Sequence, residues 1–188
     1  MFSREDVLGF WQKAQVPPAR LSVVTITAAK ILAFRRDFYD PVEAGTGVPW
    51  WVIGAIDMRE ENFNHNGYLG NGDPLRRPTT HVPKRRGPFK TWFDGAIDSI
   101  HISGWDRLPA GGHWDIVTCL IKAEAYNGVG YAHMGLRSPY VWASTNMQQR
   151  GKYTSDGKFD PSAWDQQLGC AAVWLALKLY HNVDLNEA

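Results

Sequence analysis

The sequence predicts a mainly α-helical (α+β) domain in which a small β-hairpin lobe lies beside a helical lobe. Three observations support this fold class. Apolar residues recur at the three- and four-residue spacing of helices over most of the chain. Helix-capping sequences begin several of these stretches. In contrast, residues 64–88 are rich in glycine, proline and arginine and contain Asn-Gly pairs, which are typical of hairpin turns, so this segment is expected to form a small hairpin or an irregular lobe. The 188 residues fit a single domain, 1–188, that buries its own core.

Three helices are expected before the hairpin segment. Ser3 and Asp6 form a capping box that begins the first helix, which ends before two consecutive prolines. The second helix covers about residues 19–37, although a β-branched run within it is less typical of a helix. Residues 40–47 are expected to form a loop that leads into a third helix beginning at Pro49. The sequence assigns no role to the helices within residues 1–48.

Four more helices are expected after the hairpin segment. Their predicted ranges are 91–103, 114–126, 140–144 and 160–180. Thr91 begins the first of them with a second capping box, and Asp160 is the predicted N-cap of the last. Apolar spacing in the last helix predicts that Trp164, Leu168 and Leu179 point inward.

Composition indicates an ordinary globular protein and argues against a nucleic-acid partner. Hydrophobic residues make up 44% of the chain and the formal net charge is +1, so no overall positive field would attract nucleic acid. Between Asp73 and Asp94, however, six residues are basic and none is acidic. This segment is either a solvated loop or a surface for an anionic polymer. The nine tryptophans provide indole faces, which stack on sugar rings as well as on other flat ligands.

A carboxylate at the end of a buried helix is the first candidate for catalysis. Residues 50–58 are apolar on nearly every face, which predicts an element buried on all sides. Glu60 follows directly, at the edge of a turn-rich segment. Apolar neighbours raise the pKa of a carboxyl toward neutrality, so its proton stays available to a general acid. In the alternative interpretation, Glu60 is a solvated helix end or forms a salt bridge with Arg59.

Two short motifs resemble those of the lysozyme-like superfamily. Residues 60–64 (Glu-Glu-Asn-Phe-Asn) resemble the Glu-Ser-x-Phe-Asn signature of soluble lytic transglycosylases and goose-type lysozymes, with Glu61 where serine is usual. Residues 124–130 resemble the Ala-Tyr-Asn-x-Gly motif of the same enzymes. A longer and looser pattern, from Trp51 to about Asp160, resembles peptidoglycan hydrolases of bacteria and prophages. The resemblance implies a lysozyme-like two-lobed fold with Glu60 as the catalytic acid.

The second carboxylate of the predicted site has two candidates. Glycosidases commonly pair the acid with another Asp or Glu. Asp73 followed by Thr79 looks like the Glu, Asp, Thr order of phage-type lysozymes, in which Asp and Thr hold the attacking water, although the gap after Glu60 is longer here. Asp73 alternatively only shapes a turn. Asp57 competes with it, because it lies three residues before Glu60 on roughly the same helix face.

The resemblance therefore predicts a peptidoglycan-degrading glycoside hydrolase, a bacteriolytic muramidase of the endolysin type. We expect Glu60 to protonate the glycosidic oxygen while Asp73 and Thr79 hold the water. The partner would be the glycan strand, and the residues expected to contact it are Tyr126, Asn127, Tyr140, Trp142 and Asn146. The alternatives are a lytic transglycosylase, which uses one Glu and forms a 1,6-anhydro sugar, and a non-catalytic module that binds the cell wall.

Other chemistries lack their signatures in the sequence. The six histidines are scattered, without H-E-x-x-H or Cys-pair spacing, so we expect no metal and no cofactor. Neither Gly-x-Ser-x-Gly nor a phosphate-binding loop is present. Cys119 and Cys170 lie in apolar helical contexts, where buried free thiols are expected rather than a disulfide or a peptidase nucleophile.

The location of the protein is also an expectation from the sequence. The first 20 residues carry acidic side chains and lack a long apolar run, so we expect no signal peptide. No stretch approaches the roughly 20 apolar residues that span a bilayer. We therefore expect a monomer that is made in the cytoplasm, does not insert into a membrane, and acts on the cell wall or in the periplasm after its release.

Overall fold

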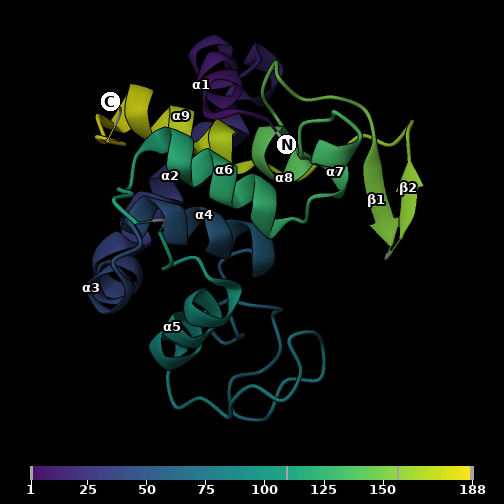
Figure 1. Ribbon diagram of the computed structural model, residues 1–188. Coiled ribbons are helices and arrows are strands. Elements are labelled where there is room, and N and C mark those ends of the chain that lie inside the picture. Colours follow the sequence, from purple (N-terminus) through teal and green to yellow (C-terminus); the bar gives the residue numbers. More distant parts are fainter. Residues whose placement is uncertain (1, 109, 156, 187–188) are drawn as a thin grey trace. The chain divides into compact units, whose positions relative to one another are not determined.

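The computed structural model describes residues 2–108, 110–155 and 157–186. It is mostly helical with one two-stranded antiparallel sheet, so the predicted mainly α (α+β) fold class is confirmed (Figure 1). The chain forms two compact units. Unit 1 combines the N-terminal segment up to Ala29 with the segment from Asp115 onward, and unit 2 is Lys30–Trp114. The boundary between the units therefore falls inside a helix, α2 (Pro18–Phe34).

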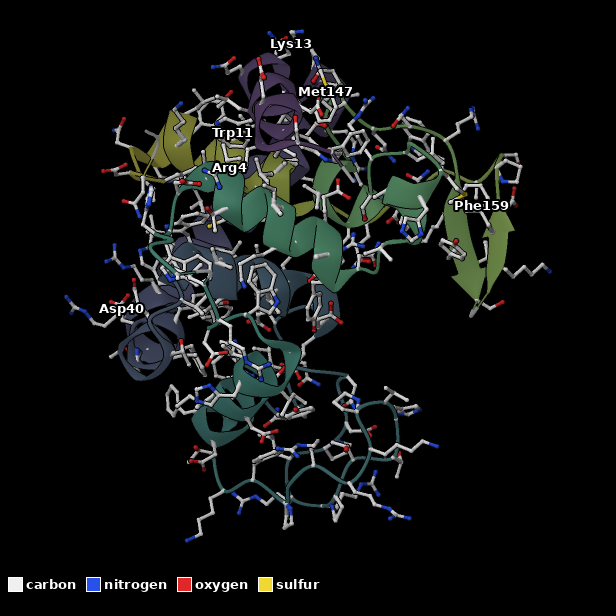
Figure 2. The ribbon with its side chains drawn as sticks, in the orientation of Figure 1. Arg4, Trp11, Lys13, Asp40, Met147 and Phe159 are labelled. Atoms are coloured by element: carbon white, nitrogen blue, oxygen red, sulfur yellow. The ribbon has the colours of Figure 1, made fainter. Side chains whose placement is uncertain are left out.

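Unit 1 is a helical unit that carries the hairpin. Its elements besides the first part of α2 are α1 (Arg4–Lys13), α6 (Ile116–Tyr126), α7 (Gly130–His133), α8 (Pro139–Trp142), β1 (Lys152–Ser155), β2 (Lys158–Asp160) and α9 (Cys170–His181). Helix α6 contacts α1, α8 and α9. The predicted capping box of Ser3 and Asp6 is present. Arg4, labelled at α1 in Figure 2, forms a 2.7 Å salt bridge with Asp115, the N-cap residue of α6.

The core of unit 1 is formed around α9. Every residue from Cys170 to Leu177 in this helix is buried. The close approach of α8 and α9 depends on Gly169, because a Cβ atom at this position would lie 2.4 Å from the backbone oxygen of Val141. Cys119 and Cys170 are buried free thiols, as expected.

The last helix is shorter than the sequence predicts. It begins at Cys170 rather than Asp160, because Asp160 is the last residue of β2, which pairs with β1 as an antiparallel hairpin, and residues 161–169 form turns and irregular backbone. Phe159, labelled in Figure 2, packs on Tyr153 at 5.3 Å between ring centroids, which stabilises the hairpin. The inward orientation predicted for Leu168 is confirmed. The inward orientation predicted for Trp164 and Leu179 is wrong, since these side chains are 43% and 62% exposed.

Unit 2 packs short helices around α4. Its elements besides the end of α2 are the π-helix η1 (Arg35–Tyr39), α3 (Asp40–Thr46), α4 (Trp50–Glu60) and α5 (Trp92–Ser103). Helix α3, where a loop was predicted, contacts η1, α4 and α5. The proline near its start and Gly47 at its end indicate a loop in the sequence. In the structure they begin and end a short helix, with Gly47 in the left-handed conformation, so the predicted loop is wrong. Thr91 and Asp94 form the predicted capping box of α5.

Residues 64–88, predicted to be a small hairpin or an irregular lobe, form an irregular loop with a single isolated bridge between Gly67 and Pro74. Four prolines in this segment lack the N–H group that a strand ladder needs. Side chains anchor the loop instead: Tyr68 and Leu69 are fully buried, and the Tyr68 hydroxyl donates a 2.9 Å hydrogen bond to Asp98. Arg86 from the basic segment also pairs with Asp98.

Among the described residues, no single helix is both long and apolar enough to cross a bilayer. One bent pair of segments, Arg4–Lys13 with Pro18–Thr46, meets the same requirement when length and composition alone are considered.

Candidate active site

Helix α4 brings two carboxyl groups to one side of unit 2. Its residues Trp50–Met58 are all buried, and Asp57 is the one ionisable side chain among them, with no exposed surface. Glu61 is the C-cap residue, and its N–H group donates to the backbone oxygen of Asp57 at 3.0 Å. Residues four apart lie above one another on a helix. The Asp57 and Glu61 side chains are therefore neighbours at the end of a buried helix.

The buried acid at this helix end is Glu61 rather than Glu60. Glu61 is 7% exposed, whereas Glu60 is only half-buried. The sequence predicts that burial by α4 keeps a proton on Glu60, and the burial in the structure favours Glu61 for this role. The four-residue spacing from Asp57 carries the Glu61 side chain back over the core, and Glu60 lies one residue around the helix at its half-buried edge.

Burial raises the pKa of Glu61 to about 8. The hydrogen bond from Trp92 lowers this pKa, and the nearby charges of Asp57 and Glu60 raise it further. The indole N–H of Trp92 donates to Glu61 Oε2 at 3.0 Å. The other oxygen, Oε1, has no hydrogen-bond partner among the described residues. Glu61 thus holds a proton near neutral pH, and its buried Oε1 is not committed to another group among the described residues.

Gly67 makes room for the available oxygen of Glu61. A Cβ atom at residue 67 would lie 2.5 Å from Glu61 Oε1 and 3.0 Å from the backbone oxygen of Gly72. Any larger residue would therefore displace the carboxyl group or the loop backbone.

Asp57 is held by two donors at one of its oxygens. Oδ2 lies 2.8 Å from the hydroxyl of Tyr39 and 2.8 Å from Nε2 of His65. Oδ1 has no partner among the described residues. Burial, with the charge of Asp57 next in importance, raises the pKa of Tyr39 far above its usual range, so Tyr39 remains a neutral donor.

Aromatic rings surround His65. The imidazole stacks on Phe38 at 3.7 Å between ring centroids, and its edge contacts are with Phe34 at 4.8 Å and Trp92 at 4.9 Å. Phe34 is in α2, Phe38 is in η1 and Trp92 begins α5, so three elements fix the orientation of the imidazole. Trp92 also bonds Glu61, and the acid and the histidine therefore contact the same indole.

Asp73 and Thr79 organise the basic loop. Asp73 Oδ2 accepts from the N–H groups of Thr80 and His81 at 2.6 and 2.9 Å, and Oδ1 lies 2.7 Å from His81 Nδ1. Hydrogen bonds from His81 are the main cause that lowers the pKa of Asp73. The Thr79 hydroxyl donates to Pro83 O at 2.5 Å and accepts from Arg86 N at 2.9 Å. These contacts favour the turn-shaping interpretation of Asp73.

The predicted sugar-binding residues belong to unit 1, whereas Glu61 belongs to unit 2. Trp142 and Tyr140 are 1% and 4% exposed, so neither ring has a face free for a sugar, which corrects the prediction for both. Asn146 donates to Lys13 O at 3.0 Å and accepts from Gln15 N at 2.8 Å, so its amide fixes the loop after α1. Asn127 donates to Ser138 at 2.7 Å, and Tyr126 lies 5.7 Å from Tyr140 between ring centroids.

Unit 1 contains a second acid with a raised pKa, the half-buried Glu124, to which the sequence assigns no role. Trp142 Nε1 donates to Glu124 Oε1 at 2.8 Å, and Ser138 N lies 3.1 Å from both carboxyl oxygens. Burial raises the pKa of Glu124 to about 7, against the effect of these hydrogen bonds. Because its acceptors are used to join α6 to α8, Glu124 has a structural role in this unit.

No set of three or more potential metal ligands gathers within the described part of the chain. Comparisons of the chain with protein-family models, curated proteins and solved structures found no significant match.

The raised pKa of Glu61 predicts a pH-dependent stability. Since the folded state binds more protons than the unfolded state between about pH 4.5 and 8, the free energy of unfolding should fall as pH rises through this window. The loss attributable to Glu61 is on the order of a few kcal/mol. Glu61→Gln should remove this part of the slope in chemical denaturation series, and Glu60→Gln should retain it. The remaining slope would come from Glu124 and Glu43, whose pKa values burial also raises, because the lowered pKa of Asp73 acts at more acidic pH.

Proposed function

We propose that the chain is a peptidoglycan-degrading glycoside hydrolase of the muramidase type, with Glu61 as its general acid. The observation that carries the proposal is the buried carboxyl of Glu61, whose pKa of about 8 keeps it protonated and whose Oε1 has no partner among the described residues. The resemblance of residues 60–64 and 124–130 to motifs of the lysozyme-like superfamily supplies the substrate class.

In this mechanism Glu61 acts at the glycosidic oxygen between two amino sugars. Its proton moves to that oxygen as the bond to the anomeric carbon breaks, and a water molecule adds to the carbon. The carboxylate that remains keeps the hydrogen bond from Trp92 Nε1, now with a charged acceptor. Trp92 therefore assists the proton transfer by stabilising the product of the acid.

A lytic transglycosylase is the second candidate, and the contacts of Asp73 favour it. Both oxygens of Asp73 are used by Thr80 and His81, so this carboxylate is committed to the loop rather than to a water molecule. Asp57 is fully buried beneath Tyr39 and His65. A site with one carboxylic acid matches the transglycosylase reaction, in which the C6 hydroxyl of the muramyl residue attacks.

Mass spectrometry of muropeptides released from purified peptidoglycan tests the proposal and separates the two candidates. Hydrolysis gives products with a reducing end, whereas transglycosylation gives 1,6-anhydro products. Formation of either kind of product by the wild-type protein, together with its loss in Glu61→Gln, supports glycan cleavage by this site. Binding to insoluble peptidoglycan without any soluble product would contradict it and indicate a binding module.

A further inference from the structure

We propose that His65, oriented by Asp57, is the general base of this site and removes the proton from the hydroxyl group that attacks the anomeric carbon. The inference rests on the proposed function and adds a second catalytic group to it. That group is needed because Asp73, the carboxylate predicted to hold the nucleophile, is engaged in the basic loop.

The two nitrogens of His65 have different surroundings. Nε2 lies 2.8 Å from Asp57 Oδ2. Nδ1 makes no hydrogen bond within the described part of the chain, and the side chain is 13% exposed. The ring thus has one nitrogen fixed in the interior and the other available to a reactant.

Asp57 selects the tautomer that a base requires. The hydroxyl of Tyr39, kept neutral by burial, donates to the same Oδ2 atom that His65 contacts. A carboxylate oxygen accepts both hydrogen bonds, so the proton of the neutral imidazole lies on Nε2 and the lone pair on Nδ1. A buried Asp orients the catalytic His of Ser-His-Asp enzymes in the same way, although there the Asp accepts from Nδ1–H and Nε2 is the base.

The ring packing places this base beside the acid. His65 is stacked on Phe38 at 3.7 Å between centroids and contacts the Trp92 indole at 4.9 Å. The same indole donates to Glu61. The Asn64 N–H donates to the Glu61 backbone oxygen at 3.1 Å, so a tight turn separates Glu61 from His65. Acid and base are therefore held by one rigid aromatic neighbour.

The titratable groups around His65 suit this role. Asp57 contacts the imidazole at Nε2, and Tyr39 bonds the same oxygen of Asp57. Glu61 bonds Trp92, the indole that also contacts His65. Lys30 Nζ lies 5.8 Å from the centroid of Phe34, one of the rings that contact His65. The negative charge of Asp57 stabilises the imidazolium that forms when His65 takes a proton.

The reaction step balances between the two residues. The attacking oxygen, from water or from the C6 hydroxyl of the muramyl residue, forms a bond to the anomeric carbon and gives its proton to His65 Nδ1. The glycosidic bond breaks with its electron pair on the leaving oxygen, which takes the proton of Glu61. An imidazolium and a carboxylate remain, and exchange of one proton with solvent at each group restores the starting state.

Substitution of His65 tests the proposal by its effect on the rate and on the pH profile. His65→Gln should lower kcat on purified peptidoglycan by on the order of 10²- to 10⁴-fold with little change in KM, the scale of general-base catalysis. The acidic limb of the pH profile should disappear, while the alkaline limb set by Glu61 persists. Added imidazole should restore part of the rate to His65→Ala. His133→Gln, an exposed histidine of unit 1, is the matched control.

The outcomes separate the base from the proposed function. In one outcome, the protein cleaves peptidoglycan in a reaction that requires Glu61, while His65→Gln keeps the full rate and the acidic limb of the pH profile. This result would overturn the role of His65 alone. Absence of cleavage by the wild-type protein would overturn both. If the His65 variants fail to fold, ¹⁵N NMR of the wild-type ring decides: a neutral Nε2–H tautomer at the pH optimum is expected, and an Nδ1–H tautomer or a persistent imidazolium would contradict the proposal.

Discussion

Glu61→Gln is expected to abolish glycan cleavage, with kcat reduced by on the order of 10³-fold. The amide has the size of the carboxyl group and its oxygen still accepts from Trp92 Nε1, which donates to Glu61 at 3.0 Å, so the fold should be retained. What the substitution removes is the proton that Glu61 holds through its pKa of about 8. Initial rates of reducing-end or anhydro-product release from purified peptidoglycan measure the effect.

Two further substitutions give this result its meaning. Glu60→Gln should retain most of the activity, because the charge of this half-buried residue has the smallest of the four effects on the pKa of Glu61. Glu5→Gln, on an exposed position of α1, controls for the loss of a surface charge. Loss of activity in Glu60→Gln with full activity in Glu61→Gln would return the acid to the residue predicted from the motif.

Gly67→Ala is expected to have the next largest effect, a loss on the order of 10²-fold in kcat, comparable with removal of one acid–base group. The added Cβ would lie 2.5 Å from Glu61 Oε1 and 3.0 Å from Gly72 O. We expect the carboxyl group to move away from Trp92 toward solvent, where its pKa falls and its proton is lost at neutral pH. The alkaline limb of the pH–rate profile should move to lower pH in the residual activity.

Gly9→Ala is the matched control for this substitution. Gly9 lies inside α1, and an added Cβ meets no atom within 4 Å. This substitution should leave activity unchanged and stabilise the helix by about 0.5–1 kcal/mol. Full activity of Gly67→Ala with an unmoved alkaline limb would show that Glu61 Oε1 does not act in the packed position.

The helices could be predicted where local signals and burial agree. Ser3 and Thr91 begin helices through capping boxes that the sequence displays, and Gly104 ends α5 in the left-handed conformation. These signals act within one turn, so they need no knowledge of tertiary contacts. The apolar run of α4 likewise predicts its burial, because no face of the helix is left polar enough for solvent.

The elements that were missed depend on contacts far along the chain. The hairpin of β1 and β2 ends at Asp160, where the last helix was predicted to begin, and packing of its aromatic residues with Tyr131 stabilises it. The π-helix η1 directs Tyr39 to Asp57, 18 residues later. Capping and periodicity do not encode such pairings.

The candidate site could be placed by sequence to within one residue. A carboxylate at the end of a buried helix was predicted, and the structure has one, but the choice between Glu60 and Glu61 depends on which side chain returns over the core. The spacing of four from Asp57 was the signal for Glu61. Neither His65 nor Trp92 could be assigned, because their contacts with Asp57 and Glu61 bring together separate elements.

The most direct test of the central claim is a ¹³C NMR titration of the Glu61 side-chain carboxyl in the wild-type protein, assigned by comparison with Glu61→Gln. The account predicts a midpoint near pH 8, reflecting the buried carboxyl beside Trp92. A midpoint near 4.5, the ordinary value for a glutamate, would contradict it, because Glu61 would then carry no proton to donate at neutral pH.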